Sequence, residues 1–166
     1  SCRNAKVTTN KGQVYEAYAD MDLTNKVEGK SGGVGENMWV YSDNTVKSAN
    51  KITVDEGAEL VQDGEYENGS DIILSSSDKI KMDVAAEAYT GGLEGVLVSK
   101  ATNRVTRNNG VEVNGKLNSA HDINLYAGAD VDGSDAELKI TGLSESHNNT
   151  LLSFYTSPKL QLDLKN

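Results

Sequence analysis

Hydrophobic and polar residues alternate along much of this chain. Between residues 15 and 23 every second residue is apolar, and acidic residues fill most of the positions between them. Side chains of a β-strand point alternately to its two faces, so a period of two predicts strands with one buried face. The same alternation occurs at residues 80–84, 111–113, 138–140 and 160–164. Apart from residues 83–88, which could form a brief helix, the pattern predicts only β-structure.

Turn residues separate these strands. Glycine follows an acidic or amide residue at Glu56-Gly57, Asp63-Gly64, Asn68-Gly69, Asn109-Gly110, Asn114-Gly115 and Asp132-Gly133. Glycine and asparagine tolerate the positive φ angles of tight turns. The chain has 16 glycines and a single proline, so tight turns should be frequent.

One longer pattern occurs twice. A triplet with β-branched ends leads to a turn, an apolar step and then Asp-Ile-x-Leu, at residues 52–74 and again at residues 111–125. The Asp-x-x-Leu motif of residues 20–23 extends the spacing, because 71 − 20 = 51 and 122 − 71 = 51. Each copy is too small to bury its own apolar face, so it needs to stack on its neighbours, as solenoid repeats do.

Two all-β folds fit these short strands. Asn-Gly and Asp-Gly turns are typical of antiparallel hairpins and would suit an antiparallel β-sandwich. Apolar steps about six residues apart favour a parallel β-helix, in which short strands form the faces of each coil. At roughly 20–25 residues per coil, the spacing of 51 corresponds to about two coils. We therefore predict that residues 1–166 form a single parallel β-helical domain.

The alternation also predicts which side chains face the interior. The inward set is Ile52, Val54, Ile72, Leu74, Val111, Val113, Ile123 and Leu125, and the outward set is Thr53, Glu112 and Asn124. Truncating an inward residue leaves a cavity between layers, so we expect Ile123→Ala to cost about 2–5 kcal/mol. Asn124→Ala on a solvated face should cost within roughly 0.5 kcal/mol.

The chain is acidic, with 25 acidic and 16 basic residues and a net charge of −9. Such a surface repels phosphate backbones and anionic lipids, which disfavours binding to nucleic acid and to membrane surfaces. No apolar run approaches the roughly 18 residues of a transmembrane helix, so we expect no membrane insertion. Residue 1 lies within the strand-and-turn pattern and not before its start, so we interpret the chain as a fragment of a longer protein.

Two segments come close to calcium-binding patterns. Residues 32–40 nearly match the nonapeptide Gly-Gly-x-Gly-x-Asp-x-apolar-x, but Asn37 replaces the aspartate and no second copy follows. Residues 130–135 hold three carboxylates, but the glycine comes one residue too early for an EF-hand loop and Thr141 replaces its glutamate. We interpret both segments as turns.

His121 and His147 stand apart from each other and from Cys2, the one cysteine, so neither suggests a zinc site. We interpret His121 as a surface residue at a turn. The prediction is therefore no metal, no cofactor and no catalytic residue.

Five residues are candidates for contact with a ligand. Lys100, Arg104 and Arg107 form the only basic cluster, which suits contact with an anion or a glycan, or else a solvated loop. Trp39 and Tyr41 stand out in a chain with few aromatic residues. An exposed pair of such rings would contact sugar or protein, but we favour a core role for these two.

Several segments resemble a known family. The repeats at residues 52–74 and 114–129, with the small-residue segments at 30–35 and 89–100, resemble those of bacterial filamentous haemagglutinin-like adhesins. The small-residue segments are similar in particular to leukotoxin-like filamentous adhesins of Gram-negative anaerobes. The resemblance covers residues 14–140, through degenerate motifs that many autotransporter passengers share. It lapses at residues 142–166, which are atypical.

The resemblance implies a long right-handed parallel β-helical stalk. Such a protein is exported through an outer-membrane secretion partner and is displayed on the bacterial surface or released. The implied partner of this segment is a host cell-surface protein or glycan. The family offers no catalytic residues, so the expectation is that the chain is not an enzyme. Two alternatives remain: a β-helical polysaccharide lyase or hydrolase, and a passive spacer within the stalk.

Overall fold

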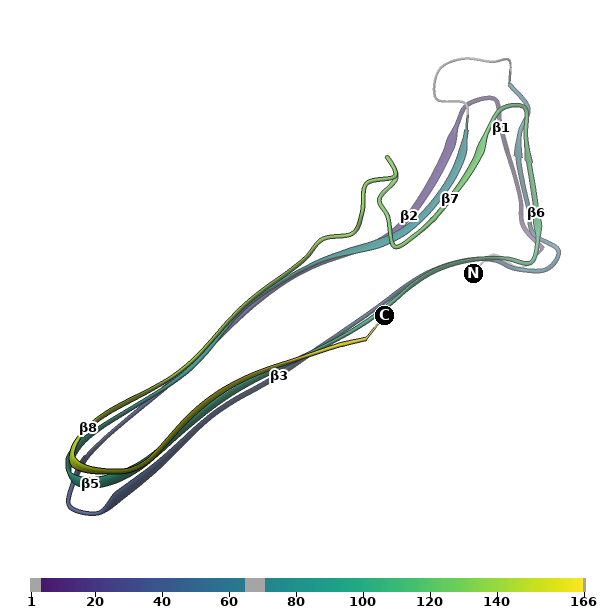
Figure 1. Cartoon of the computed structure of the whole chain (residues 1–166). Coiled ribbons are helices and arrows are strands. Elements are labelled where there is room, and N and C mark those ends of the chain that lie inside the picture. The colour runs from purple at the N-terminus through teal and green to yellow at the C-terminus, as the bar shows by residue number, and fades with distance from the viewer. Residues whose placement is uncertain (1–3, 65–70, 166) are drawn as a thin grey trace. The chain divides into compact units, whose positions relative to one another are not determined.

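The computed structural model describes residues 4–64 and 71–165; for residues 153 and 154 it describes the backbone alone. The described residues form eight strands and no helix (Figure 1). The strands are β1 (Lys6–Thr9), β2 (Gln13–Gly33), β3 (Glu36–Val54), β4 (Glu59–Gln62), β5 (Ile72–Val113), β6 (Lys116–Ser119), β7 (Ile123–Ala127) and β8 (Leu138–Lys165). No helix that could span a membrane is found in this part of the chain. The all-β prediction is confirmed, and residues 83–88 are strand.

The strands pair in two sheets. β1, β4 and β6 form one sheet in that order, and they run parallel (Figure 1). In the other sheet β5 lies between β2 and β3, and it also pairs in parallel with β7 and β8. Every strand pair with a described register is parallel, and the one antiparallel bridge in the described residues is isolated. Parallel pairing contradicts the antiparallel β-sandwich.

Neighbouring strands are much further apart in the sequence than the length of one predicted coil. Ile72 pairs with Ile123 and Ile80 pairs with Leu138, so the residue numbers of these partners differ by 51 (123 − 72) and by 58 (138 − 80). The repeat spacing of 51 therefore joins direct neighbours, and the prediction that it spans two coils is wrong. The reason is strand length, because β5 alone runs for 42 residues.

The motif at residues 20–23 is not a third copy. The Gln13 amide donates to the Asp71 carbonyl oxygen at 2.8 Å, as the Ile72 amide donates to the Asp122 carbonyl oxygen at 3.0 Å. Gln13 is thus the neighbour of Ile72, and their residue numbers differ by 59 (72 − 13). The spacing of 51 between Asp20 and Asp71 is a coincidence.

Several predicted turns are observed, and one is not. Gly57 and Gly133 both have a φ of 81°, a left-handed conformation that a side chain would strain. Asn114-Gly115 lies between β5 and β6, as predicted. Asn109-Gly110, however, lies within β5, because its neighbours extend the strand. Asn68-Gly69 lies outside the described residues.

The chain divides into two compact units, each built from three separate segments. Unit 1 takes residues 1–21, 48–79 and 107–137, and unit 2 takes residues 22–47, 80–106 and 138–166. Strands β2, β3 and β5 contribute residues to both units. The single domain therefore stays a prediction.

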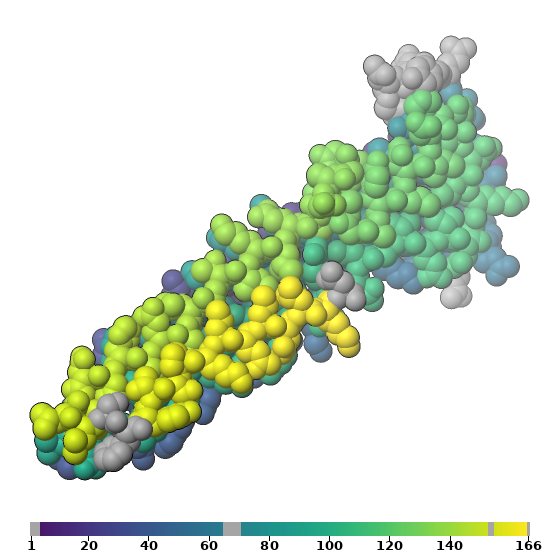
Figure 2. Space-filling view, viewed as in Figure 1, coloured from purple at the N-terminus to yellow at the C-terminus, as the bar shows by residue number. Residues whose placement is uncertain are grey.

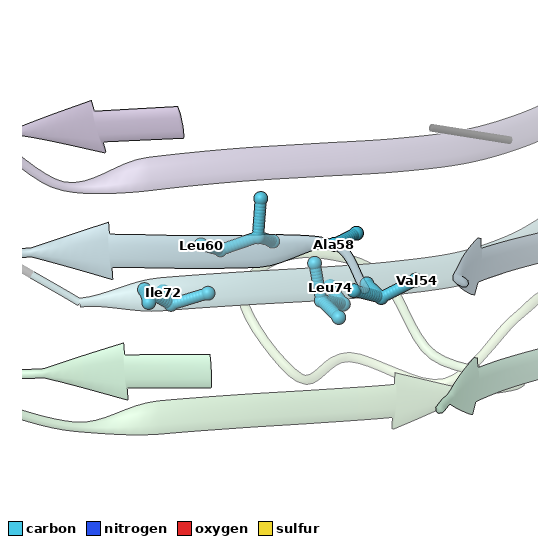
Figure 3. Close-up of a cluster of buried hydrophobic side chains, with 5 residues drawn as sticks. All are labelled: Val54, Ala58, Leu60, Ile72 and Leu74. Atoms are coloured by element: carbon cyan, nitrogen blue, oxygen red, sulfur yellow. The ribbon is translucent and has the colours of Figure 1, made fainter. Parts of the chain in front are cut away.

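The core of unit 1 gathers apolar side chains from β3, β4 and β5 and from the residue directly before β4. Its buried members are Val54, Ala58, Leu60, Ile72 and Leu74 (Figure 3). The half-buried residues packed against them are Tyr15, Ile52, Val111, Val113 and Leu117. Six residues of the predicted inward set thus belong to this core or pack on it.

Two residues of the inward set are not buried. Ile123 and Leu125 of β7 are 41% and 50% exposed, although they pair in register with the fully buried Ile72 and Leu74. In the described part of the chain β7 has a neighbour only on its β5 side. The estimate of about 2–5 kcal/mol for Ile123→Ala is therefore too large. The predicted outward residues Thr53, Glu112 and Asn124 are half-buried.

Unit 2 has two sheet segments whose inward side chains meet. One contains residues 22–33, 80–92 and 138–150, and the other contains residues 36–47, 94–106 and 152–165. Across the interior, Asn25 Nδ2 donates to Asn44 Oδ1 at 2.6 Å. Asn44 Nδ2 in turn donates to Asn103 Oδ1 at 3.3 Å on the neighbouring strand of its own segment. The third strand of each segment, β8, covers the side of unit 2 that faces the viewer (Figure 2).

Candidate functional site

Two exposed aromatic rings lie on the outer face of one sheet segment of unit 2. Trp39 and Tyr41 of β3 alternate with buried Val40 and Ser42, so their side chains point away from the interior. They are 54% and 58% exposed. The favoured interpretation of a core role for this pair is therefore wrong.

The strand register brings Tyr41 and Trp39 together with residues of β5. Asn44 and Asn103, joined by a hydrogen bond, are 59 residues apart, and this offset places Tyr41 beside Lys100 (41 + 59 = 100). It also places Trp39 beside Val98. On its other side β5 pairs with β8, where Lys100 is the partner of Lys159. One row across the sheet thus reads Tyr41, Lys100 and Lys159.

A third exposed ring joins this face from β8. Tyr155 pairs with Val96 of β5 and is 55% exposed. The sequence resemblance did not point to Tyr155, because it lapses in this part of the chain. Only the parallel pairing of β8 with β5 shows that Tyr155 shares a face with Trp39.

The face carries a local positive charge, and we call it the basic face. It is the outer surface of residues 37–47, 96–106 and 155–165. These segments contain the basic residues Lys47, Lys100, Arg104, Lys159 and Lys165 and the acidic residues Asp43 and Asp163, a net charge of +3 (5 − 2). The whole sheet segment that carries this face, residues 36–47, 94–106 and 152–165, also contains Glu36 and Glu94, which bring its net charge to +1 (5 − 4). The other sheet segment of unit 2, residues 22–33, 80–92 and 138–150, contains four lysines and five acidic residues, a net charge of −1 (4 − 5). The positive charge is therefore concentrated on the basic face itself.

The charges of the basic face are not equally available. Arg104 forms an ion pair with Asp43, and its Nε lies 3.7 Å from Asp163 Oδ2. Among the described residues, neither Lys100 nor Lys159 takes part in an ion pair. A ligand can therefore engage these two ammonium groups without displacing a carboxylate.

Arg107, the fifth candidate residue, does not join the basic face. It belongs to unit 1, where its Nε donates to Asp78 Oδ1 at 2.7 Å. The Asp78 side chain is fully buried and that of Arg107 nearly so. Burial works to raise the pKa of Asp78, but hydrogen bonds from Arg107 and Ser48 and the charge of Arg107 outweigh it and lower the pKa. The ion pair of Arg107 with Asp78 therefore lies in the interior of unit 1 and has a structural role there.

His121, interpreted from the sequence as a surface residue at a turn, has two carboxylate neighbours. Its Nδ1 contacts Asp71 Oδ1 and lies 3.8 Å from Asp122 Oδ2. The hydrogen bond with Asp71 raises the pKa of His121, and the same bond lowers the pKa of Asp71. Of the residues that the structure describes, only these three form a group of histidine, cysteine or carboxylate ligands suited to a metal ion. The repeated Asp-Ile at residues 71 and 122 was the sequence signal that could have located them.

His147 has a different environment, in unit 2. Its ring stacks on Tyr89 with the ring centroids 4.6 Å apart, and Lys30 Nζ lies 5.6 Å from the Tyr89 centroid. A hydrogen bond from Tyr89 to Glu87 raises the pKa of Tyr89 to about 12. His147 Nε2 also lies 2.9 Å from Glu145 Oε2. These contacts link neighbouring strands.

The two segments near calcium-binding patterns contain turns. In residues 130–135 the Gly133 amide donates to the Asp130 carbonyl oxygen at 2.8 Å, which closes the turn. The Ser134 amide donates to Asp132 Oδ1 at 2.9 Å, and hydrogen bonding by Ser134 lowers the pKa of Asp132. Residues 34 and 35 connect β2 and β3, and Gly35 has a φ of 71°.

No protein-family model, curated protein or solved structure matches this chain. The arrangement of the basic face itself indicates what it can do. Exposed aromatic rings offer flat apolar surface, and the neighbouring ammonium groups donate hydrogen bonds. Both are held by paired strands, which suits contact with a polar or anionic ligand.

Proposed function

We propose that this chain is a binding segment of a bacterial filamentous adhesin that is secreted or displayed on the cell surface. The basic face is its contact surface for a host cell-surface protein or glycan. The observation that carries this proposal is the exposed pair Trp39 and Tyr41 beside Lys100, on a positive face of a chain with a net charge of −9. Aromatic residues are enriched in interfaces, where they supply much of the binding energy.

The fold that we propose for this segment is a right-handed parallel β-helix. Parallel pairing of segments that are distant in the sequence supports it, as in the pairs Ile72 with Ile123 and Ile80 with Leu138. The alternation of buried and exposed residues in β3 and β5 supports it as well. We further propose that the full-length protein is exported through an outer-membrane secretion partner.

A stacked sheet suits a contact surface because it spaces its side chains regularly. Neighbouring strands lie about 4.8 Å apart, and alternate residues of one strand lie about 6.8 Å apart. The row Tyr41, Lys100 and Lys159 therefore presents a ring and two ammonium groups at nearly even intervals. A ligand with repeated polar groups can engage such a row at several points.

The aromatic contribution is tested by binding of the purified chain to host epithelial cells and matrix proteins, with an unrelated β-helical protein as reference. Trp39→Ala with Tyr41→Ala should weaken binding at least about tenfold, because interface aromatics are frequent hot spots. Tyr18→Ala is the matched control, since Tyr18 is an exposed tyrosine of unit 1. Equal binding by the double variant and the control contradicts the proposal.

The charge contribution is tested by reversing the charge of two lysines on each sheet segment of unit 2. Lys100→Glu with Lys159→Glu should weaken binding and reduce its dependence on salt. Lys81→Glu with Lys139→Glu changes net charge equally on the other segment and should have a smaller effect. If the unmodified chain binds no cell or matrix protein, the spacer alternative replaces the adhesin. Turnover of a polysaccharide that one aspartate substitution abolishes would establish the lyase or hydrolase alternative.

A further inference from the structure

We propose that Asp71, His121 and Asp122 form a binding site for Zn²⁺ in unit 1. These residues offer one imidazole nitrogen and two carboxylate oxygens as ligand atoms, and these atoms all lie within 4.8 Å of one another. Zinc in proteins takes this mixture of nitrogen and oxygen ligands. The site is separate from the basic face and does not depend on the proposed adhesin function.

One pair of ligand atoms is spaced almost as around a coordinated ion, whereas His121 Nδ1 and Asp71 Oδ1 are in direct contact and have to separate when the ion binds. With ligand distances of about 2.1 Å, two ligand atoms of a tetrahedral zinc ion lie about 3.4 Å apart. His121 Nδ1 and Asp122 Oδ2 lie 3.8 Å apart, and the Asp122 side chain is 70% exposed. A small rotation of the exposed Asp122 side chain therefore brings both atoms to one ion.

The parallel stacking of β5 and β7 gives the site its charge. Asp71 and Asp122 directly precede the paired residues Ile72 and Ile123, so two carboxylates lie side by side in neighbouring strands. Like charges at such neighbouring positions repel each other. A divalent cation held between the two strands removes that repulsion, and His121 adds the nitrogen ligand that favours zinc over calcium.

Hydrogen bonds orient the ligands before an ion binds. Asp71 accepts from the Asp122 amide and from Asn124 Nδ2, each at 3.4 Å. The His121 amide donates to Ser119 Oγ at 3.1 Å, which holds the turn that carries the imidazole. Such supporting contacts orient metal ligands and raise affinity. Three protein ligands leave the fourth zinc position for water or a further ligand.

The test uses the purified chain and Zn²⁺ alone. Titration calorimetry should show one equivalent of Zn²⁺ bound, and Co²⁺ should give the visible absorption of a tetrahedral site. His121→Ala should weaken Zn²⁺ binding at least about tenfold. His147→Ala is the matched control, because His147 also lies beside a carboxylate but in unit 2, and it should leave Zn²⁺ affinity unchanged.

A second variant covers the case in which His121→Ala disturbs folding. Asp122→Asn changes an exposed side chain, and circular dichroism should confirm that its strands are intact. It should also weaken Zn²⁺ binding at least about tenfold, and the imidazole NMR signals of His121 should shift with Zn²⁺ in the unmodified chain. The proposal is overturned if the unmodified chain binds no Zn²⁺, or if a folded variant of either residue binds Zn²⁺ as tightly as the parent.

Discussion

Strand β5 pairs in register with β7 and with β8, but apolar residues that are buried in β5 have exposed partners in β7 and β8. Ile72 of β5 is fully buried, whereas its partner Ile123 of β7 is 41% exposed. Ala101 of β5 is also fully buried, whereas its partner Leu160 of β8 is 52% exposed. β5 has strands on both of its edges, but in the described residues β7 and β8 pair only with β5.

This difference shows that position in the stack decides burial here, more than residue type does. A small alanine is buried in β5 and a large leucine is exposed in β8, although both point to the same side of their sheet. Polar residues follow the same rule, because Ser75, Ser76, Ser77 and Asp78 of β5 are all buried. The contribution of a side chain to stability should therefore depend on its strand.

The largest difference in stability loss between a buried and an exposed position is expected for ion pairs. Asp78→Ala should lower the free energy of unfolding by about 3–5 kcal/mol, because it leaves the Arg107 guanidinium unpaired in the interior of unit 1. Asp163→Ala removes a partner of Arg104 on the exposed face and should cost about 0–1 kcal/mol. Urea denaturation of both variants checks the comparison, and equal losses would contradict it.

The next largest difference in stability loss is expected between the paired isoleucines Ile72 and Ile123. Ile72→Ala should cost about 2–5 kcal/mol, since it leaves a cavity between packed strands. Ile123→Ala makes the same chemical change on β7 and should cost about 1 kcal/mol, because its side chain is already partly in water. The two variants are compared by denaturant unfolding, and a loss at Ile123 as large as that at Ile72 would show that β7 is not an edge strand in solution.

The contribution of the buried Asp78 carboxylate of β5 to stability should decrease in acid. The pKa of Asp78 is lowered in the folded chain, so its charge stabilises the fold above the usual value of 3.8. That contribution is lost as the pH falls from this value through the lowered pKa. Asp78→Asn cannot lose a charge there, so the stability difference between the parent and this variant should shrink in acid. Unfolding curves at neutral pH and at about pH 2.5 measure the change, and a constant difference would contradict it.

The smallest expected effect concerns the amide ladder. Asn44 donates to Asn103, but Asn103 Nδ2 is buried without a hydrogen-bond partner among the described residues. Its partner position on β8 is Leu162, which is half exposed. Leu162→Asn supplies an acceptor oxygen there and should stabilise the fold by about 0.5–1 kcal/mol. Leu164→Asn is the control, because its β5 partner is Val105, and it should give no gain in denaturant unfolding.

Local pattern was enough to predict much of the fold. Alternation identified strand residues in β2, β5 and β8, and it placed Ile72 and Leu74 in the interior. The spacing between residues 71 and 122 is a true pairing distance. These features depend only on side chains that alternate between two faces of a strand, which the order of residues determines directly.

The candidate site was only partly predictable. Four of the five candidate residues lie in unit 2 on one face, where alternation already separates exposed from buried positions. Arg107 does not, because its partner Asp78 lies 29 residues away and nothing in the local sequence links them. Tyr155 and the neighbours of His121 were missed for the same reason.

By itself the sequence determined that the chain is all-β, which side chains alternate and where Gly57 and Gly133 turn the backbone. The tertiary structure alone decided which strands are neighbours, and so which residues of distant segments share a face. It also decided that Ile72 is buried while Ile123 is exposed, although the two have the same local pattern. The physical reason is that burial and electrostatic contact depend on what covers a side chain, and in parallel stacking the covering residues come from distant parts of the sequence.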